Sequence, residues 1–187
     1  MPHRLARTVV AAVALLALAG CGNKHHEVTE APTEGIWVDV GELDYQVQLA
    51  RQLTPAMAPD RSYLSGLPDG ILPPSGRETW FAVFLRIENR TEEPHPTARE
   101  IEIVDTEEKV YRPLELDRDT NPFAYVPRDL PANSLIPEPD SAPSFSSAGG
   151  ELLLFKLPIE SFYNRPLELR IASADVEPRE AIIDLDL

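Results

Sequence analysis

The sequence predicts an all-β fold, an antiparallel β-sandwich of about eight strands that occupies residues 36–187. Two observations favour it. Short segments of alternating apolar and polar residues follow one another, which is the pattern of half-buried strands. Nineteen prolines and nine glycines in the 187-residue chain separate these segments, and no long helical period or internal repeat interrupts them. About eight short strands are typical of a two-sheet sandwich.

Two early strands are expected, over residues 36–40 and 45–53. Apolar residues recur at every second position in the first, and in the second at every such position except Arg51. The apolar face of the second strand is predicted to carry Tyr45, Val47, Leu49 and Leu53.

The strongest strand signal is residues 80–88, whose first half is apolar on both faces. One row consists of Phe81, Val83, Leu85 and Ile87. Trp80 and Phe84 stand on the opposite face. A strand covered on one side only would not carry two aromatic residues on the other. We therefore expect a second layer of chain over Trp80 and Phe84.

The remaining strands are predicted at residues 101–104, 110–116, 151–157, 167–172 and 181–187, with a hairpin loop at 105–109. Two long proline-rich segments, 54–78 and 117–148, interrupt the series. Segments of this length are usually functional or disordered. For 117–148, which contains several apolar residues, two interpretations stay open: it covers Trp80 and Phe84, or it is a mobile binding loop.

The N-terminus has the pattern of a secretory signal peptide. Arg4 and Arg7 precede an apolar run from Val9 to Ala19, and small residues end it. The run is eleven residues long, whereas a membrane-spanning helix needs about 20. Residues 1–20 are therefore expected to be removed on export.

The run Leu18-Ala19-Gly20-Cys21 resembles the lipobox of bacterial lipoproteins, in which a diacylglyceryl group is attached to the cysteine sulfur before cleavage. Cys21 is the only cysteine, and lipidation explains a lone cysteine in an exported chain. We predict an anchor at Cys21 and a flexible tether over residues 21–35. The alternative is an ordinary signal peptide and a free thiol.

The charge balance disfavours two classes of partner. Without Arg4 and Arg7 the chain carries 15 basic and 31 acidic residues, a formal charge of −16. Such a surface repels nucleic acid and anionic headgroups. We expect no nucleic-acid partner, and contact with the membrane through the lipid on Cys21.

Three stretches carry a family resemblance. They are Tyr45-Gln-Val47, Phe81-Ala-Val-Phe-Leu-Arg-Ile-Glu-Asn89 and Gly149-Gly-Glu-Leu-Leu-Leu-Phe155-Lys-Leu-Pro158. With the lipobox and the tether, they resemble bacterial surface lipoproteins, of actinobacterial type, that carry an immunoglobulin-like domain of unknown function. The resemblance covers most of residues 36–187 and implies an immunoglobulin-like sandwich exposed in the cell envelope. It implies no reaction.

One string is similar to a metal-binding loop. Asp117-Arg-Asp119-Thr-Asn121 begins like a calcium loop, but its sixth position is Pro122 instead of glycine and its twelfth is Arg128 instead of glutamate. We interpret the string as loop capping. The alternative is an irregular calcium site that also uses Asp129.

Other metal and catalytic sites are disfavoured. Zinc and copper need clustered ligands, but His25-His26, His95 and Met57 are scattered. His95, flanked by prolines, is the only histidine of the predicted domain, and no Gly-x-Ser-x-Gly elbow is present. Glu100 and Glu102 share the polar face of a strand, where charges are usually solvated.

Aromatic side chains are the remaining candidates for recognition, since they combine large contact area with low entropy cost. Tyr63, Tyr125 and Trp37 are the candidate recognition residues, whereas most aromatic residues of a small sandwich belong to its core. We therefore expect a lipid-anchored, non-catalytic envelope protein that needs no cofactor or metal and binds a protein or wall component. Two alternatives are a wall-polymer hydrolase with paired carboxylates and a structural spacer.

Overall fold

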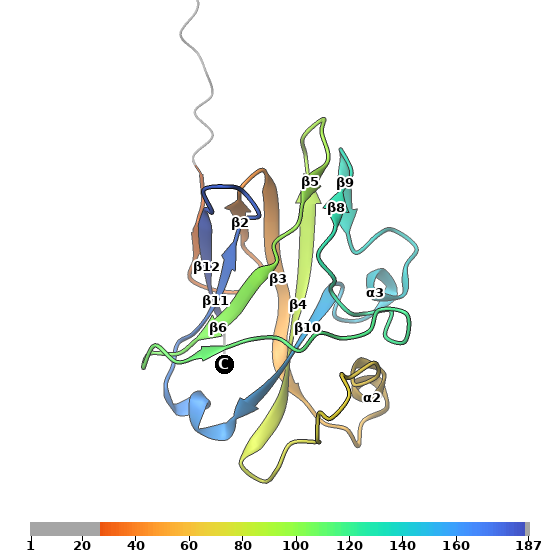
Figure 1. The fold of residues 1–187 in the computed structure, drawn as a ribbon, viewed down its shortest axis with the longest axis vertical. Coiled ribbons are helices and arrows are strands. Elements are labelled where there is room, and N and C mark those ends of the chain that lie inside the picture. Colours follow the sequence, from red (N-terminus) through yellow and green to blue (C-terminus); the bar gives the residue numbers. More distant parts are fainter. Residues whose placement is uncertain (1–26, 186–187) are drawn as a thin grey trace, which may run out of the picture.

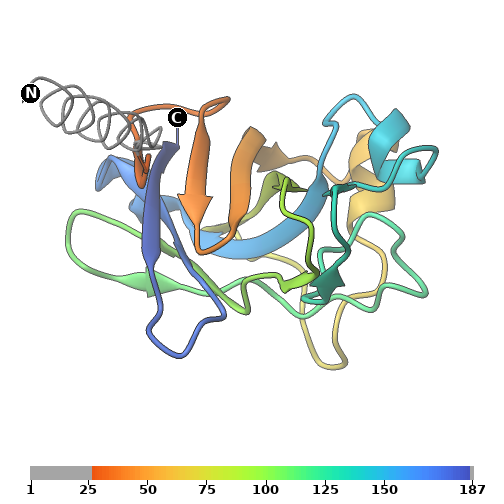
Figure 2. The same cartoon turned by 90° about the horizontal axis from the view of Figure 1, so that it is seen from above.

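The computed structural model describes residues 27–185, which form a β-sandwich (Figure 1). One sheet has the strand order β1-β12-β11-β6-β7 and the other β10-β4-β3-β2, with β9 beside β4. Figure 2 shows the sheets as two facing layers, with the short helices α2 and α3 gathered at one end. The predicted all-β sandwich is confirmed.

The strands of the first sheet are β1 (Glu30–Ala31), β6 (Glu100–Val104), β7 (Val110–Tyr111), β11 (Leu167–Ala172) and β12 (Glu180–Leu185). Those of the second are β2 (Trp37–Val40), β3 (Leu43–Leu53), β4 (Glu78–Asn89), β9 (Ser134–Ile136) and β10 (Glu151–Pro158). A separate pair joins β5 (His95–Pro96) to β8 (Asp129–Leu130). The helical segments are α2 (Ala58–Tyr63), α3 (Ala142–Phe145) and the 3-10 turn η1 (Ile159–Tyr163).

The main core lies between the two sheets, and β4 is its central strand. Its predicted inner row is fully buried: Phe81, Val83, Leu85 and Ile87. Side chains from β6, β11 and β12 belong to the same core. Burying each large apolar side chain contributes about 1.5–3 kcal/mol, so this layer is a major source of stability for the sandwich.

A second core lies on the outer side of β4 and β10. Trp80 and Phe84 are 3% and 0% exposed there, so the expectation that they are covered is confirmed. The cover comes from both long segments: Tyr63 at the end of α2, and Phe123 with Ala124 from the later one. The contribution of the segment that contains α2 was not expected from the sequence.

Strand β3 departs from the predicted pattern. A β-bulge shifts its register against β4 between Val47 and Leu49. Val47 belongs to the main core, whereas Leu49 and Leu53 pack in the second core. The predicted shared face of Tyr45 and Val47 is confirmed, whereas the placement of Leu49 and Leu53 on that face was wrong, because one extra residue inverts the alternation beyond it.

The start of the sandwich lies inside the stretch predicted as tether. Glu30 and Ala31 form β1, which pairs in parallel with β12 at Ile182 and Ile183. Ala31 is 4% exposed and belongs to the main core. The prediction of a flexible tether up to residue 35 is therefore corrected. A strand of two residues is too short to show an alternating pattern in the sequence.

Gly150 has a steric role at the entry to β10. A Cβ atom at this position would lie 2.9 Å from the backbone of Leu85, which is closer than side chains tolerate. Glycine therefore lets β10 approach β4 closely enough to pair along Glu151–Pro158.

Candidate functional site

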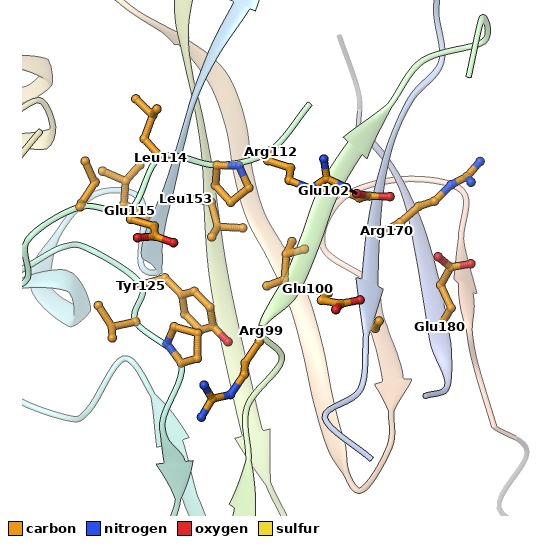
Figure 3. Close-up of a pocket in the computed structure, with 17 residues that line it drawn as sticks. Arg99, Glu100, Glu102, Arg112, Leu114, Glu115, Tyr125, Leu153, Arg170 and Glu180 are labelled. Carbon is orange, nitrogen blue, oxygen red and sulfur yellow. Dashed lines mark ion pairs between the residues drawn. The ribbon is translucent and has the colours of Figure 1, made fainter. Parts of the chain in front are cut away.

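A groove opens at one edge of the sandwich, between β6 of the first sheet and β10 of the second (Figure 3). Its volume is about 840 Å³, which is within the range of ligand-binding clefts.

The groove exists because the chain leaves the first sheet soon after β7. A strand was predicted over residues 110–116, but pairing with β6 ends at Tyr111. Pro113 has no N–H to continue the ladder. The next amide, Leu114 N, donates instead to Leu154 O of the opposite sheet at 2.7 Å. This crossing segment, residues 112–116, forms one wall of the groove.

The buried residues that line the groove are apolar or aromatic: Ile101, Leu116, Tyr125, Leu152 and Leu153. Half-buried Leu114, Val126 and Pro127 line it as well. Figure 3 shows Leu114 and Glu115 on one side of the opening, and Glu100 and Glu102 on β6. The groove therefore combines buried apolar side chains with charged side chains at its opening.

Charged residues surround the opening. They come from β6 and the residue before it, from the crossing segment, and from β11 and β12: Arg99, Glu100, Glu102, Arg112, Glu115, Arg170 and Glu180. Two of the arginines are paired, since Arg112 lies 3.3 Å from Glu102 and Arg170 lies 3.0 Å from Glu168.

The charges that remain are mainly negative. Within residues 27–185, Glu100, Glu115 and Glu180 form no ion pair, and neither does Arg99. All four of these residues are exposed. The rim therefore carries an excess of uncompensated carboxylates, which attracts cations.

Tyr125 is held by a buried hydrogen-bond pair beneath the groove. Its hydroxyl donates to Ala98 O at 2.6 Å, while Ala98 N donates to the hydroxyl of Tyr45 at 2.7 Å. Burial raises the pKa of Tyr125 to about 12, so its phenol is neutral at physiological pH. The hydroxyl fixes the wall of the groove and is already engaged.

A buried carboxylate ties the wall to β10. Glu151 is 1% exposed, and its oxygens lie 2.8 Å from Arg128 and 3.0 Å from Arg118. Both arginines reach the same carboxylate from the long segment 117–148. Removing one partner of such a buried group is costly, so this triad holds the segment in place.

The three candidate recognition residues do not converge. Tyr63 is 4% exposed and packs edge-on against Phe84 and Phe123, with ring centroids 5.0 and 4.9 Å away. A partner cannot reach it, so its assignment to recognition is corrected. Tyr125 lines the groove with a 9% exposed side chain.

Trp37 lies elsewhere, half-buried on the outer face of the second sheet. The guanidinium groups of Arg86 and Arg90 lie 5.9 and 5.7 Å from the centre of its ring. These cation–π contacts occupy the ring within the fold.

The calcium-like string forms hydrogen bonds of its own. Asp117 accepts from Asp119 N at 3.0 Å and from the hydroxyl of Thr120 at 2.6 Å. The Asn121 amide donates to Tyr63 O and Ser65 O, so it fastens the two long segments together. These contacts support the interpretation as loop capping. In residues 27–185 no group of three or more acids, histidines or cysteines could hold a metal ion.

The paired acids lie at the groove, which the sequence did not indicate. Glu100 and Glu102 occupy the outer face of β6, and both line the opening. Cys21, the lipobox residues Leu18, Ala19 and Gly20, and the pair His25-His26 lie outside the described residues. His95 pairs with Leu130 through the backbone in the β5–β8 ribbon.

Other groove residues could not be predicted from the sequence. Arg99, Arg112, Glu115, Arg170 and Glu180 lie in separate stretches, and only the fold brings them together. Pro113 was the one available signal, because a proline inside a predicted strand marks an edge or an interruption.

Comparisons with known proteins show the fold and no activity. No protein-family model matches the chain, and no curated protein matches it. The yjhA protein of Bacillus subtilis matches with a TM-score of 0.52 at 9% identity, over 83% of this chain and 99% of its own. At that identity the likeness establishes a shared fold alone.

Two further structures match with lower TM-scores. An uncharacterised β-sandwich protein of Clostridium difficile gives 0.44 at 10% identity, over 87% of this chain and 98% of its own. A candidate lipoprotein of Bacillus subtilis, ycdA, gives 0.46 at 8% identity, over 79% of this chain and 38% of its own. Within residues 27–185, no helix has the length and apolar character needed to cross a membrane.

Proposed function

We propose that this protein is a lipid-anchored component of the bacterial envelope whose sandwich binds a partner in the edge groove and does not catalyse a reaction. The lipobox-like run ending at Cys21 supports the anchor and the extracytoplasmic location. The observation that carries the binding role is the groove itself, which is lined by apolar and charged side chains and which the crossing segment keeps open.

Binding is favoured over hydrolysis by the surroundings of the two acids. Glu102 is paired with Arg112, and Glu100 is exposed to solvent. Acid–base cleavage of a glycosidic bond needs two convergent carboxyl groups in distinct environments, one of them shielded from water. The hydrolase remains the second candidate because both acids line the same groove.

A crosslinking experiment tests the binding role. A photoreactive amino acid placed at Glu115, on the groove rim, is expected to give a discrete product in intact cells. The same residue placed at Glu92, which is exposed and outside the groove, is the matched control. Filling the groove with Ala172→Trp should abolish the product at position 115, because Ala172 lines it.

Three outcomes contradict the proposal. Equal products from both positions, or none at position 115, indicate a spacer and not a binding module. Turnover of peptidoglycan by the full chain that is lost in Glu100→Gln or Glu102→Gln supports the hydrolase instead.

A further inference from the structure

The groove side of β6 is an unpaired strand edge. On its other side, β6 pairs with β11 along all five residues, from Glu100 to Val104. On the groove side it pairs with β7 only at Ile103 and Val104. Asp105 N donates to Lys109 O on this side. Because the backbone groups of successive residues alternate between the two neighbouring strands, the N–H and C=O of Ile103 and Ile101 also point toward the groove. The position opposite Ile101 in this register is Pro113, which cannot donate.

The opposite wall cannot close over this edge. The crossing segment is hydrogen-bonded to β10 through Leu114 N. The chain around Tyr125 is also hydrogen-bonded to β10, because Tyr125 N donates to Leu152 O at 2.9 Å. Pro113 and Pro127 supply no amide hydrogens on this wall. The backbone groups of Ile101 therefore face a fixed opening, and exposed edges of this kind pair readily with an added strand.

The charge of the rim selects the kind of strand. Arg112 and Arg170 form ion pairs with Glu102 and Glu168. Within the described part of the chain, the unpaired rim charges are then the carboxylates of Glu100, Glu115 and Glu180 and the single cation Arg99. Side chains of an extended peptide alternate between the two sides of the strand. A segment with apolar residues facing Leu153 and cationic residues facing the rim matches the groove.

We propose that the groove binds an extended segment of a partner protein, rich in lysine or arginine at alternate positions, which adds to the edge of β6 as an extra strand. This inference deepens the proposed function and rests on it. A sugar polymer fits less well, because stacking needs an exposed aromatic face and Tyr125 is 9% exposed.

Peptide retention tests the inference. The purified full chain is immobilised in detergent and exposed to a pool of octapeptides with lysine at every second position and valine, threonine, leucine or tyrosine between. A second pool carries glutamate in place of lysine. The lysine pool should be retained about tenfold more strongly than the glutamate pool at low salt. Methylating the backbone nitrogens along one edge of the peptide that is retained best should weaken its binding by about tenfold.

Paired variants locate the binding. Glu115→Gln with Glu180→Gln should lower retention of the lysine pool by about tenfold. Glu92→Gln with Glu93→Gln removes the same charge outside the groove and should leave retention unchanged. Bound peptide should also slow hydrogen exchange of the Ile101 amide.

Each negative result has a defined meaning. Equal retention of both pools, or an N-methylated peptide that binds as well as its parent, overturns strand addition. If the crosslink at position 115 persists while no lysine peptide binds, this inference fails and the proposed binding function stands.

Discussion

Asp39 and Asp44 are opposite each other in the β2–β3 ladder, an arrangement that normally repels. Asp39 also accepts a hydrogen bond from Val28 N at 2.6 Å. Burial, followed by a hydrogen bond to Asp39, raises the pKa of Asp44 to about 6. Arg90, whose guanidinium lies 3.2 Å from Asp44, acts in the opposite direction and does not cancel the shift.

This shift predicts a stability loss between about pH 4 and pH 6. The folded chain holds a proton on Asp44 that the unfolded chain has released, so rising pH through this window lowers the free energy of unfolding. Asp44→Asn removes the titration and should stabilise the chain at pH 7 by about 1–3 kcal/mol relative to wild type. Urea unfolding at pH 4 and pH 7 measures the difference.

Asp69→Asn is the control, because Asp69 is exposed. Its free energy of unfolding should follow that of wild type at both pH values. A gain in Asp44→Asn that is equal at pH 4 and pH 7 contradicts the assigned titration.

The sequence showed the polar character of Asp39 and Asp44 but not their proximity. Alternation places both on a polar face, and such positions are usually solvated. Their pairing depends on the length of the β2–β3 turn, which the pattern of apolar residues does not define to the residue. The bulge after Val47 could not be predicted either, because no glycine or proline marks it in the sequence.

At the scale of elements, the sequence of strand β4 predicts that its outer face is covered, but not which segment covers it. Trp80 and Phe84 opposite an apolar row required a cover, and the cover is present. The helix that supplies Tyr63 was not predictable, because α2 has six residues and helices this short show no periodicity. Asp60, 2% exposed, fixes α2 by pairing with Arg51 at 2.6 Å.

Tyr63→Ala tests the structural role of this tyrosine. Removing a side chain packed against Phe84 and Phe123 leaves a cavity in the second core. We expect the free energy of unfolding to fall by about 3 kcal/mol. Tyr163→Ala is the matched control, since Tyr163 is 84% exposed, and should change stability by less than about 0.5 kcal/mol.

Denaturation monitored by tryptophan fluorescence measures both variants, because Trp80 lies in the same core. If Tyr63→Ala is as stable as Tyr163→Ala, the packing of Tyr63 against Phe84 and Phe123 does not stabilise the second core, which contradicts this prediction.

At the scale of the whole molecule, the groove is a product of topology. Its charged rim draws on residues as far apart in the chain as Arg99 and Glu180. Alternation defines which face of a strand is polar but not which strands are neighbours. The sequence therefore predicted the sandwich and most of its strands, while the site depended on the order β12-β11-β6 and on the crossing after Pro113.

The structure also shortens the stretch between the sandwich and the proposed anchor at Cys21. Since β1 begins at Glu30, the folded part starts closer to Cys21 than the sequence indicated.

The last prediction concerns the proposed anchor and rests on the run ending at Cys21. A serine cannot form the thioether to the diacylglyceryl group, so Cys21→Ser should abolish lipid modification and leave the chain uncut or released from the membrane. Metabolic labelling with a radioactive fatty acid, membrane fractionation and mass spectrometry of the mature N-terminus measure these effects. Asn23→Ser, which spares the run, should label and fractionate like wild type. A free thiol at Cys21 in the wild-type protein would refute the anchor and favour an ordinary signal peptide.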